Sequence, residues 1–117
     1  MASHRASKRL EKARELLVER ADELSVALEQ FRSATCAGIE LSRQGVSLLD
    51  GLDETGGPSV RTNLNMALDA MEGARREVRA AMIGVAIEEG MTVGQLAKAL
   101  GLSRQLLYRV ASEDRPK

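Results

Sequence analysis

The sequence contains no tryptophan, one tyrosine, one phenylalanine and a single cysteine. One cysteine excludes a disulfide within the chain and a cysteine-rich zinc site, so we interpret Cys36 as a small apolar helix residue. No run of apolar residues is long enough to span a bilayer, and no signal-peptide pattern opens the chain. These absences predict a cytoplasmic protein with no membrane partner.

Motifs of enzyme chemistry are also missing. The chain has no glycine-rich phosphate loop ending in Lys-Ser/Thr, no pair of histidines and no nucleophile with a candidate base. Asp50, Asp53 and Glu54 lack the spacing and the terminal glutamate of a calcium loop. The only histidine, His4, lies near the terminus. The sequence therefore predicts no catalytic residues, no metal site and no cofactor.

The hydrophobic residues that are present favour helices. They make up 44% of the 117 residues, and because aromatic residues are only 2%, the core must be built from Leu, Ala, Val, Ile and Met. Such side chains suit helix packing better than sheets. The chain is long enough for one domain, or for one small domain with an extension. We expect an all-α fold.

Residues 1–6 are interpreted as a disordered start, followed by a long helix over residues 7–49. Apolar residues recur there in alternating steps of three and four, interrupted at Arg14, which is the pattern of a heptad seam. A helix of that length cannot bury its seam alone, so residues 7–49 are predicted to dimerise. The predicted dimerisation residues are Leu10, Leu17, Ala21, Leu24, Leu28 and Phe31.

Residues 50–59 are rich in glycine and acidic side chains and are interpreted as a linker. A second long helix is predicted over residues 60–89, capped by Ser59, bent or split at Gly73 and ended by Gly90. Its predicted inward positions are Leu64, Ala67, Leu68, Met71, Val78, Met82, Val85 and Ala86.

Two arrangements of the long helices remain open. They could fold back as a helical hairpin, two of which would form a four-helix bundle in a dimer. Alternatively, the first helix could form a parallel two-stranded coiled coil. The apolar surface of the second helix favours the bundle, because a free helix would not carry so much.

Residues 90–117 are predicted to contain two short helices joined by a tight turn, with a short tail. Thr92 and Gln95 have the spacing of a capping box, and Gly101 provides the left-handed backbone conformation of the turn. Ser103 is the expected cap of the last helix. The apolar residues on the inner side of both helices are Leu96, Ala97, Leu100, Leu102, Leu107 and Val110. Leu106 would be exposed on the two helices alone, and three roles stay open for it: contact with a thymine methyl, packing on another part of the chain, or simple exposure.

The last helix places polar side chains where a DNA-reading helix would need them. Arg104 and Gln105 fall in its first turn, and these residue types pair with guanine and adenine, respectively. Tyr108 and Arg109 follow one turn later. Phosphate contacts are expected from Lys98, and the cluster Arg75, Arg76 and Arg79 is a further candidate. The predicted DNA-binding residues are Thr92, Gln95, Lys98, Ser103, Arg104, Gln105, Tyr108 and Arg109.

The segment "TVGQLAKALGLSRQLLYRV" resembles the helix-turn-helix of bacterial and phage DNA-binding proteins. The matching features, counted from Val93, are alanine at the fifth position, glycine at the ninth and apolar residues at the eighth, tenth, fifteenth and eighteenth. Its ending is similar to the DNA-binding tail of resolvases and invertases. The resemblance covers about a fifth of the chain, and no recombinase catalytic domain fits in the remainder. It implies double-stranded DNA as a partner.

The charge distribution agrees with this expectation. The formal net charge of the chain is zero, but residues 75–117 carry eight basic and five acidic residues. We therefore expect a dimeric, sequence-specific DNA-binding protein, either a transcriptional regulator or a nucleoid, plasmid or phage accessory factor. The alternative is an adaptor whose N-terminal helices recruit another protein.

Overall fold

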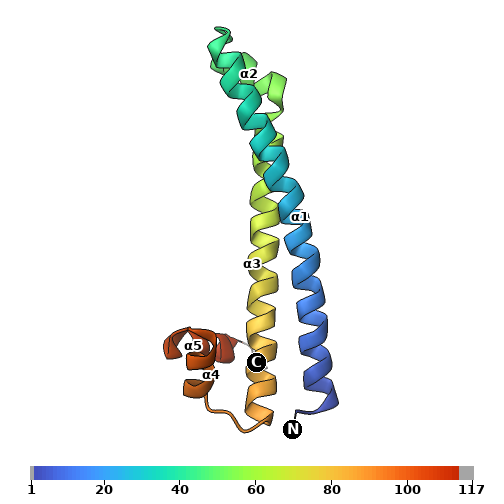
Figure 1. Ribbon diagram of the computed structural model, residues 1–117, viewed down its shortest axis with the longest axis vertical. Coiled ribbons are helices and arrows are strands. Elements are labelled where there is room, and N and C mark those ends of the chain that lie inside the picture. The colour runs from blue at the N-terminus through green and yellow to red at the C-terminus, as the bar shows by residue number, and fades with distance from the viewer. Residues whose placement is uncertain (1, 114–117) are drawn as a thin grey trace. The chain divides into compact units, whose positions relative to one another are not determined.

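The computed structural model describes residues 2–113 and is helical throughout, with no strand in that range. The predicted all-α class is confirmed. Figure 1 shows the five helices along the chain. Their bounds are α1 His4–Arg43, α2 Leu48–Thr55, α3 Gly57–Glu88, α4 Val93–Leu100 and α5 Arg104–Glu113. Met1 and the tail residues 114–117 lie outside the described range.

Contacts within the chain divide it into two compact units. The first unit comprises residues 1–18 and 72–117, and the second comprises residues 19–71. α1 and α3 each contribute residues to both units, so the first unit is formed from two separate segments, whereas the second is one continuous stretch of sequence.

The start of α1 differs from the prediction of disorder over residues 1–6. Ser3 caps the helix, because its Oγ accepts a hydrogen bond from the Ala6 amide at 3.1 Å. The Ser3 amide in turn donates to Glu88 Oε2, at the end of α3, at 2.6 Å. Ser3 and Ala6 therefore have specific hydrogen-bond partners, and α1 begins at His4 rather than Ser7.

The predicted helix over residues 7–49 and the predicted linker over residues 50–59 are both wrong at their common boundary. The chain leaves α1 after Arg43 and turns through Gly45, which has a φ of 83°. Ser47 then caps α2 by accepting a hydrogen bond from the Asp50 amide at 3.2 Å. Asp50 also lies in the first turn, where its negative charge is favoured by the helix dipole. These two residues convert the expected linker into a helix.

The second long helix begins earlier than predicted. Gly56 ends α2 in the left-handed conformation, with a φ of 65°, and α3 starts at Gly57 with Pro58 in its first turn. Ser59 is therefore inside the helix and is not its cap. Gly73 does not split α3, which continues to Glu88. The predicted stop at Gly90 is confirmed, since this residue has a φ of 84°.

Within the first unit, α3 is covered on two sides (Figure 1). Val78 and Ala81 of α3 pack against Ala13 of α1. Leu10 and Leu17 of the predicted dimerisation seam also pack here, so part of that seam is used within the chain. The heptad position between Leu10 and Leu17 is occupied by the polar residue Arg14, and the adjacent Ala13 makes the buried contact with α3 instead. The Arg9 side chain adds an ion pair with Glu77, with Nε and Oε1 2.8 Å apart.

The other side of α3 meets α4 and α5. The shared core consists of buried residues from all three helices, with Met91, Val93, Leu100, Leu102 and Leu106 partly buried around it. Its buried residues are Ala80, Ile83, Ala86, Leu96, Ala97, Leu107 and Val110. Alanines of α3 face α1 on one side and the α4–α5 pair on the other. Because their side chains are small, helices can approach α3 closely on both faces, which explains the alanine-rich sequence of this part of α3.

The second unit buries much less. Ala27 is its one buried hydrophobic residue among those the structure describes. Leu28 and Phe31 of the predicted seam are exposed, as is Leu68, which was wrongly predicted to face inward. Ala21 and Leu24 are half-buried.

Candidate nucleic-acid interface

The start of α4 is fixed by a complete capping box. The Thr92 Oγ1 accepts a hydrogen bond from the Gln95 amide at 3.1 Å. The Gln95 Oε1 accepts one from the Thr92 amide at 2.8 Å. This confirms the predicted box. Because both side chains satisfy backbone groups of their own helix, their first role is to set where α4 begins.

The turn between α4 and α5 also follows the sequence prediction. Gly101 adopts the left-handed conformation, with a φ of 68°, and its amide donates to carbonyls of the last turn of α4. Ser103 then caps α5, because its Oγ accepts a hydrogen bond from the Leu106 amide at 3.1 Å. α5 therefore begins at Arg104.

One face of α5 is buried. Leu107 is 0% exposed and Val110 is buried beside it, in contact with the core that includes Leu96 and Ala97. These inward positions are confirmed. Leu106 is half-buried and packs against the same core, so of the three roles left open for it, packing on another part of the chain is the one that the structure shows. α3 contributes part of this core and so accounts for the contact. The sequence of the two short helices alone does not reveal that contribution.

The opposite face of α5 is exposed and polar. Arg104, Gln105, Tyr108 and Arg109 are all exposed, with Tyr108 at 60%. Their spacing of three and four residues puts them on one side of the helix. Lys98 is exposed on α4. Within residues 2–113, no ion pair is formed by Lys98, Arg104 or Arg109.

Gly94 belongs to this site, although the sequence gave no reason to select it. A Cβ at Gly94 would lie 3.1 Å from Nη2 and 3.2 Å from Cζ of Arg104. The guanidinium of Arg104 therefore lies over the first turn of α4, and a side chain at position 94 would require it to shift by a few tenths of an ångström. A glycine followed ten residues later by arginine is too general a pattern to have identified this contact.

The arginines of α3 divide into paired and unpaired side chains. Arg75 forms an ion pair with Glu72 at 3.2 Å, and both side chains are about half exposed. Such a pair contributes little to stability. Arg76 and Arg79 form no ion pair with the described residues.

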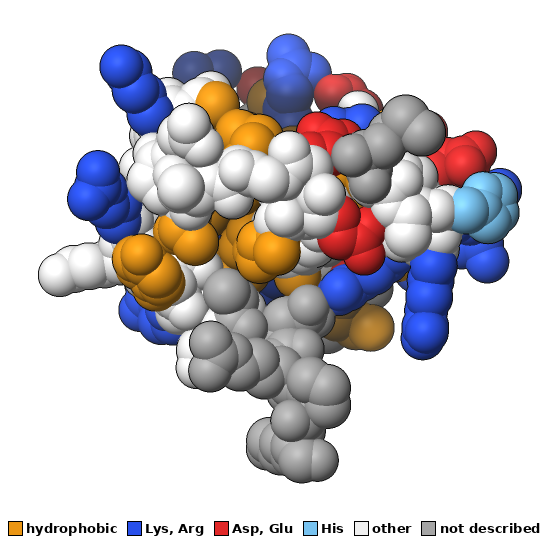
Figure 2. All heavy atoms as spheres, turned by 90° about the horizontal axis from the view of Figure 1, so that it is seen from below, with side chains coloured by type: hydrophobic (Ala, Val, Ile, Leu, Met, Phe, Trp, Pro, Cys, Tyr) orange, Lys and Arg blue, Asp and Glu red, His pale blue; other side chains and the backbone are white. Residues whose placement is uncertain are grey.

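The two units differ in net charge, and each has a larger net charge than the +3 of residues 75–117. The first unit contains thirteen Lys and Arg residues against eight Asp and Glu, a net charge of +5. The second contains four basic residues against nine acidic ones, a net charge of −5. Figure 2 shows Lys and Arg side chains projecting around the rim of the face that it presents, with hydrophobic side chains between them. The exposed face of α5 thus belongs to the basic unit.

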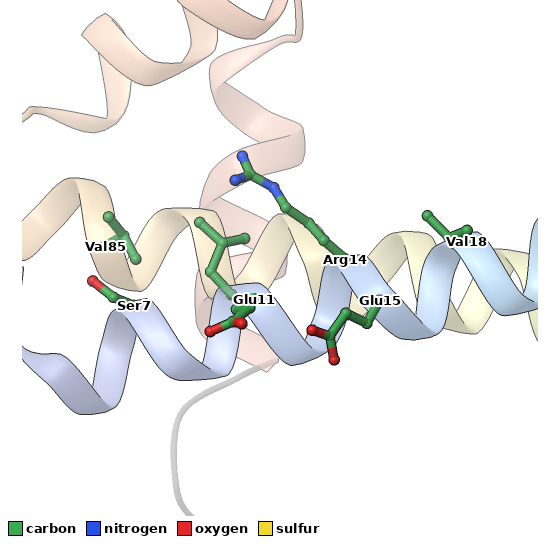
Figure 3. Close-up of a pocket in the computed structure, with 7 residues that line it drawn as sticks. Ser7, Glu11, Arg14, Glu15, Val18 and Val85 are labelled. Carbon is green, nitrogen blue, oxygen red and sulfur yellow. The ribbon is translucent and has the colours of Figure 1, made fainter.

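A shallow depression of about 490 Å³ lies elsewhere in the first unit, along α1. Its lining includes Glu11, Arg14 and Glu15 of α1 and Val85 of α3. Figure 3 shows the Arg14 guanidinium and the Glu15 carboxylate directed away from each other. The depression thus holds charges of both signs.

Among residues 2–113, no three His, Cys, Asp or Glu side chains gather where they could hold a metal ion. None of the helices in that range combines the length and the hydrophobicity needed to cross a bilayer. Cys36 is exposed on α1. Comparison of the chain with known protein families, curated proteins and solved structures found no match.

Proposed function

We propose that the protein binds double-stranded DNA in a sequence-specific way, with α4 and α5 acting as a helix-turn-helix. The observation that carries this proposal is the division of α5 into two faces. Leu107 and Val110 anchor one face in the core, and Arg104, Gln105, Tyr108 and Arg109 project from the other. An anchored helix that presents uncompensated basic and amide side chains suits the major groove.

The proposed roles follow from the chemistry of each side chain. Gln105 reads a base edge through its amide, which can pair bidentately with adenine. Arg104 and Arg109 contact guanine or phosphate, and Lys98 contacts phosphate. Thr92 and Ser103 position the two helices through their caps. The net charge of +5 on this unit supports association with a polyanion.

We propose further that the protein acts as a homodimer. Two copies related by a two-fold axis would place their α5 helices about 34 Å apart, in successive major grooves of a pseudo-palindromic site. Because Leu10 and Leu17 pack within the chain, the self-association surface is sought among exposed hydrophobic residues of the second unit. Those on α1 and α3 include Val26, Leu28, Met66 and Leu68.

Selection from a randomised duplex pool tests sequence-specific binding. We expect enrichment of a defined half-site, and weaker binding of the selected duplex by Gln105→Ala. Loss of one base contact should cost about 1–3 kcal/mol, so the dissociation constant should rise roughly 5- to 150-fold. Gln30→Ala, at an exposed position of α1 in the second unit, is the matched control. A pool that stays random after selection would contradict the proposal.

A second candidate function is an adaptor that recruits another protein through its N-terminal helices. The exposed hydrophobic residues of the second unit favour it, since large apolar side chains left in water mark interaction surfaces. Under this alternative, the purified protein would capture one stoichiometric protein partner and would leave no footprint on DNA.

A further inference from the structure

The second unit contains an apolar groove with a volume of about 940 Å³. Its walls come from the last part of α1, from α2 and from the first turns of α3. Phe31, Ile39, Leu48, Leu52 and Val60 are among the lining side chains. A volume of this size falls within the range of about 300–1,000 Å³ that is usual for small-molecule sites.

Five hydroxyl side chains lie along the groove; the three threonines donate to backbone carbonyls, and Ser42 is exposed to solvent. Thr35 Oγ1 donates to the Phe31 carbonyl at 2.8 Å, Thr55 Oγ1 to that of Gly51 at 2.9 Å, and Thr62 Oγ1 to that of Pro58 at 3.0 Å. Ser47 Oγ is engaged in capping α2. These side chains therefore need no hydrogen bond from a ligand, and the walls are in effect apolar.

The charges of the groove are all of one sign. Arg43 and Arg61 line it, and no acidic residue does, although the second unit contains nine acidic residues and only four basic ones. The guanidinium of Arg43 is 3.8 Å from the Glu40 carboxylate, and both side chains are mostly exposed. Arg61 forms no ion pair within the described part of the chain. Arg61 is thus available to an anion, whereas Arg43 must exchange its exposed contact with the Glu40 carboxylate for one with the anion.

Two glycines keep the groove open. Gly38 lies inside α1 and Gly51 inside α2, and both line the groove. A Cβ at either position would meet no atom within 4 Å. Glycine inside a helix costs about 0.5–1 kcal/mol relative to alanine, and no close packing within the chain offsets that cost here. A molecule that approaches the helix backbone would give these positions a use.

We propose that this groove binds a free, single-chain amphipathic carboxylate of the fatty-acid class. The hydrocarbon chain lies on the apolar walls at Phe31, Ile39 and Leu52. The carboxylate accepts hydrogen bonds from the guanidinium groups of Arg43 and Arg61 at the exposed edge. This site is independent of the proposed DNA-binding function, because all of its residues belong to the second unit.

The observations favour a small anion over a second copy of the chain. Of the exposed hydrophobic side chains of the second unit, Phe31, Ile39, Leu48 and Leu52 line the groove. Val26, Leu28, Met66 and Leu68 lie outside it and leave a separate surface for self-association. A concave site with two cations, no anions and satisfied hydroxyl groups matches a molecule with one anionic end and a long apolar remainder.

Isothermal titration of the full-length protein with dodecanoate below its micelle concentration tests the proposal. Dodecanol and dodecyltrimethylammonium provide the same chain with a neutral and a cationic head. We expect dodecanoate to bind at one site per chain and about tenfold or more tightly than dodecanol, because charge-assisted hydrogen bonds contribute about 1.5–3 kcal/mol. Arg61→Gln should remove that preference. Arg32→Gln, whose side chain lies in the same unit outside the groove, should retain it.

A second variant tests the location of the hydrocarbon chain. Gly38→Leu projects a side chain into the open space of the groove and should weaken dodecanoate binding at least tenfold. Gly73→Leu makes the same change inside α3, away from the groove, and should leave binding intact. Circular dichroism of both variants establishes that they are folded.

Three outcomes would overturn the proposal. One is the absence of dodecanoate binding to the wild-type protein. Another is equal affinity for the three head groups with no effect of Arg61→Gln. The third is self-association in sedimentation experiments that Gly38→Leu abolishes, which would assign the groove to a second copy of the chain.

Discussion

At the scale of single residues, Leu107 is the most completely buried of the described side chains of α5. It is 0% exposed and touches a core built from three helices. Truncating it to alanine removes buried apolar contacts and leaves a cavity that these helices can only partly close.

We expect Leu107→Ala to lower the free energy of unfolding by about 2–5 kcal/mol. Leu49→Ala, at a position that is 70% exposed, should change it by about 0.5 kcal/mol or less. Urea denaturation followed by circular dichroism measures both values. Equal effects of the two substitutions would show that Leu107 is not packed as described.

Glu88 provides a prediction for pH dependence. Hydrogen bonds from Ser3, first from its amide and then from its hydroxyl, hold the pKa of the Glu88 carboxyl below its ordinary value. A carboxyl whose pKa is lower in the folded state contributes stability above its unfolded pKa. That contribution is lost as the pH falls through the folded pKa.

The difference in unfolding free energy between the wild-type protein and Glu88→Gln should therefore be largest near neutral pH. It should shrink as the pH falls below about 4.3, the ordinary pKa of glutamate. Urea titrations at a series of acidic pH values measure this difference. Glu89→Gln, which removes a neighbouring carboxyl without a hydrogen bond to Ser3, is the control. A difference that grows on acidification would have the wrong sign for this account.

At the scale of elements, α4 and α5 could be predicted closely because their boundaries depend on local signals. Thr92, Gln95, Gly101 and Ser103 act within one helical turn of their own positions, so the sequence alone specifies them. The cap of α2 at Ser47 is equally local. It was missed because the glycines and acidic residues that follow it resemble a linker. The start of α1 depends on Glu88, 85 residues from Ser3, which no local pattern can reveal.

Gly101→Ala tests the turn between α4 and α5. A Cβ in the left-handed conformation costs about 1–2 kcal/mol, so the unfolding free energy should fall by about that amount. Gly73→Ala, inside α3 with open space around its Cα, should instead raise it by about 0.5–1 kcal/mol. Chemical denaturation measures both. A change of the same sign for the two variants would contradict the assigned backbone conformations.

At the scale of the whole molecule, the second unit lies in sequence between the two segments of the first. This insertion explains why the charge of the first unit and the burial of its heptad seam could not be predicted from the sequence. Residues 1–18 add three net positive charges to a unit whose other part is distant in sequence. A window along the chain therefore underestimates how basic that unit is. The heptad seam has the same limitation. Its spacing predicts an apolar stripe at Leu10 and Leu17, but spacing does not say that α3 of the same chain covers it.

We propose that α5 of the basic unit contacts double-stranded DNA. The most direct test of this claim is the salt dependence of binding to the duplex obtained by selection, measured by fluorescence anisotropy. We expect the logarithm of the binding constant to fall linearly with the logarithm of salt concentration, with a slope of about −0.9 for each phosphate neutralised. Arg109→Gln should reduce the magnitude of that slope by about one if it contacts phosphate, or lower affinity by about 1–3 kcal/mol at every salt concentration if it reads a base. Arg32→Gln, in the acidic unit, should change neither quantity. The absence of measurable binding at low salt, or identical behaviour of the two arginine variants, would contradict the claim.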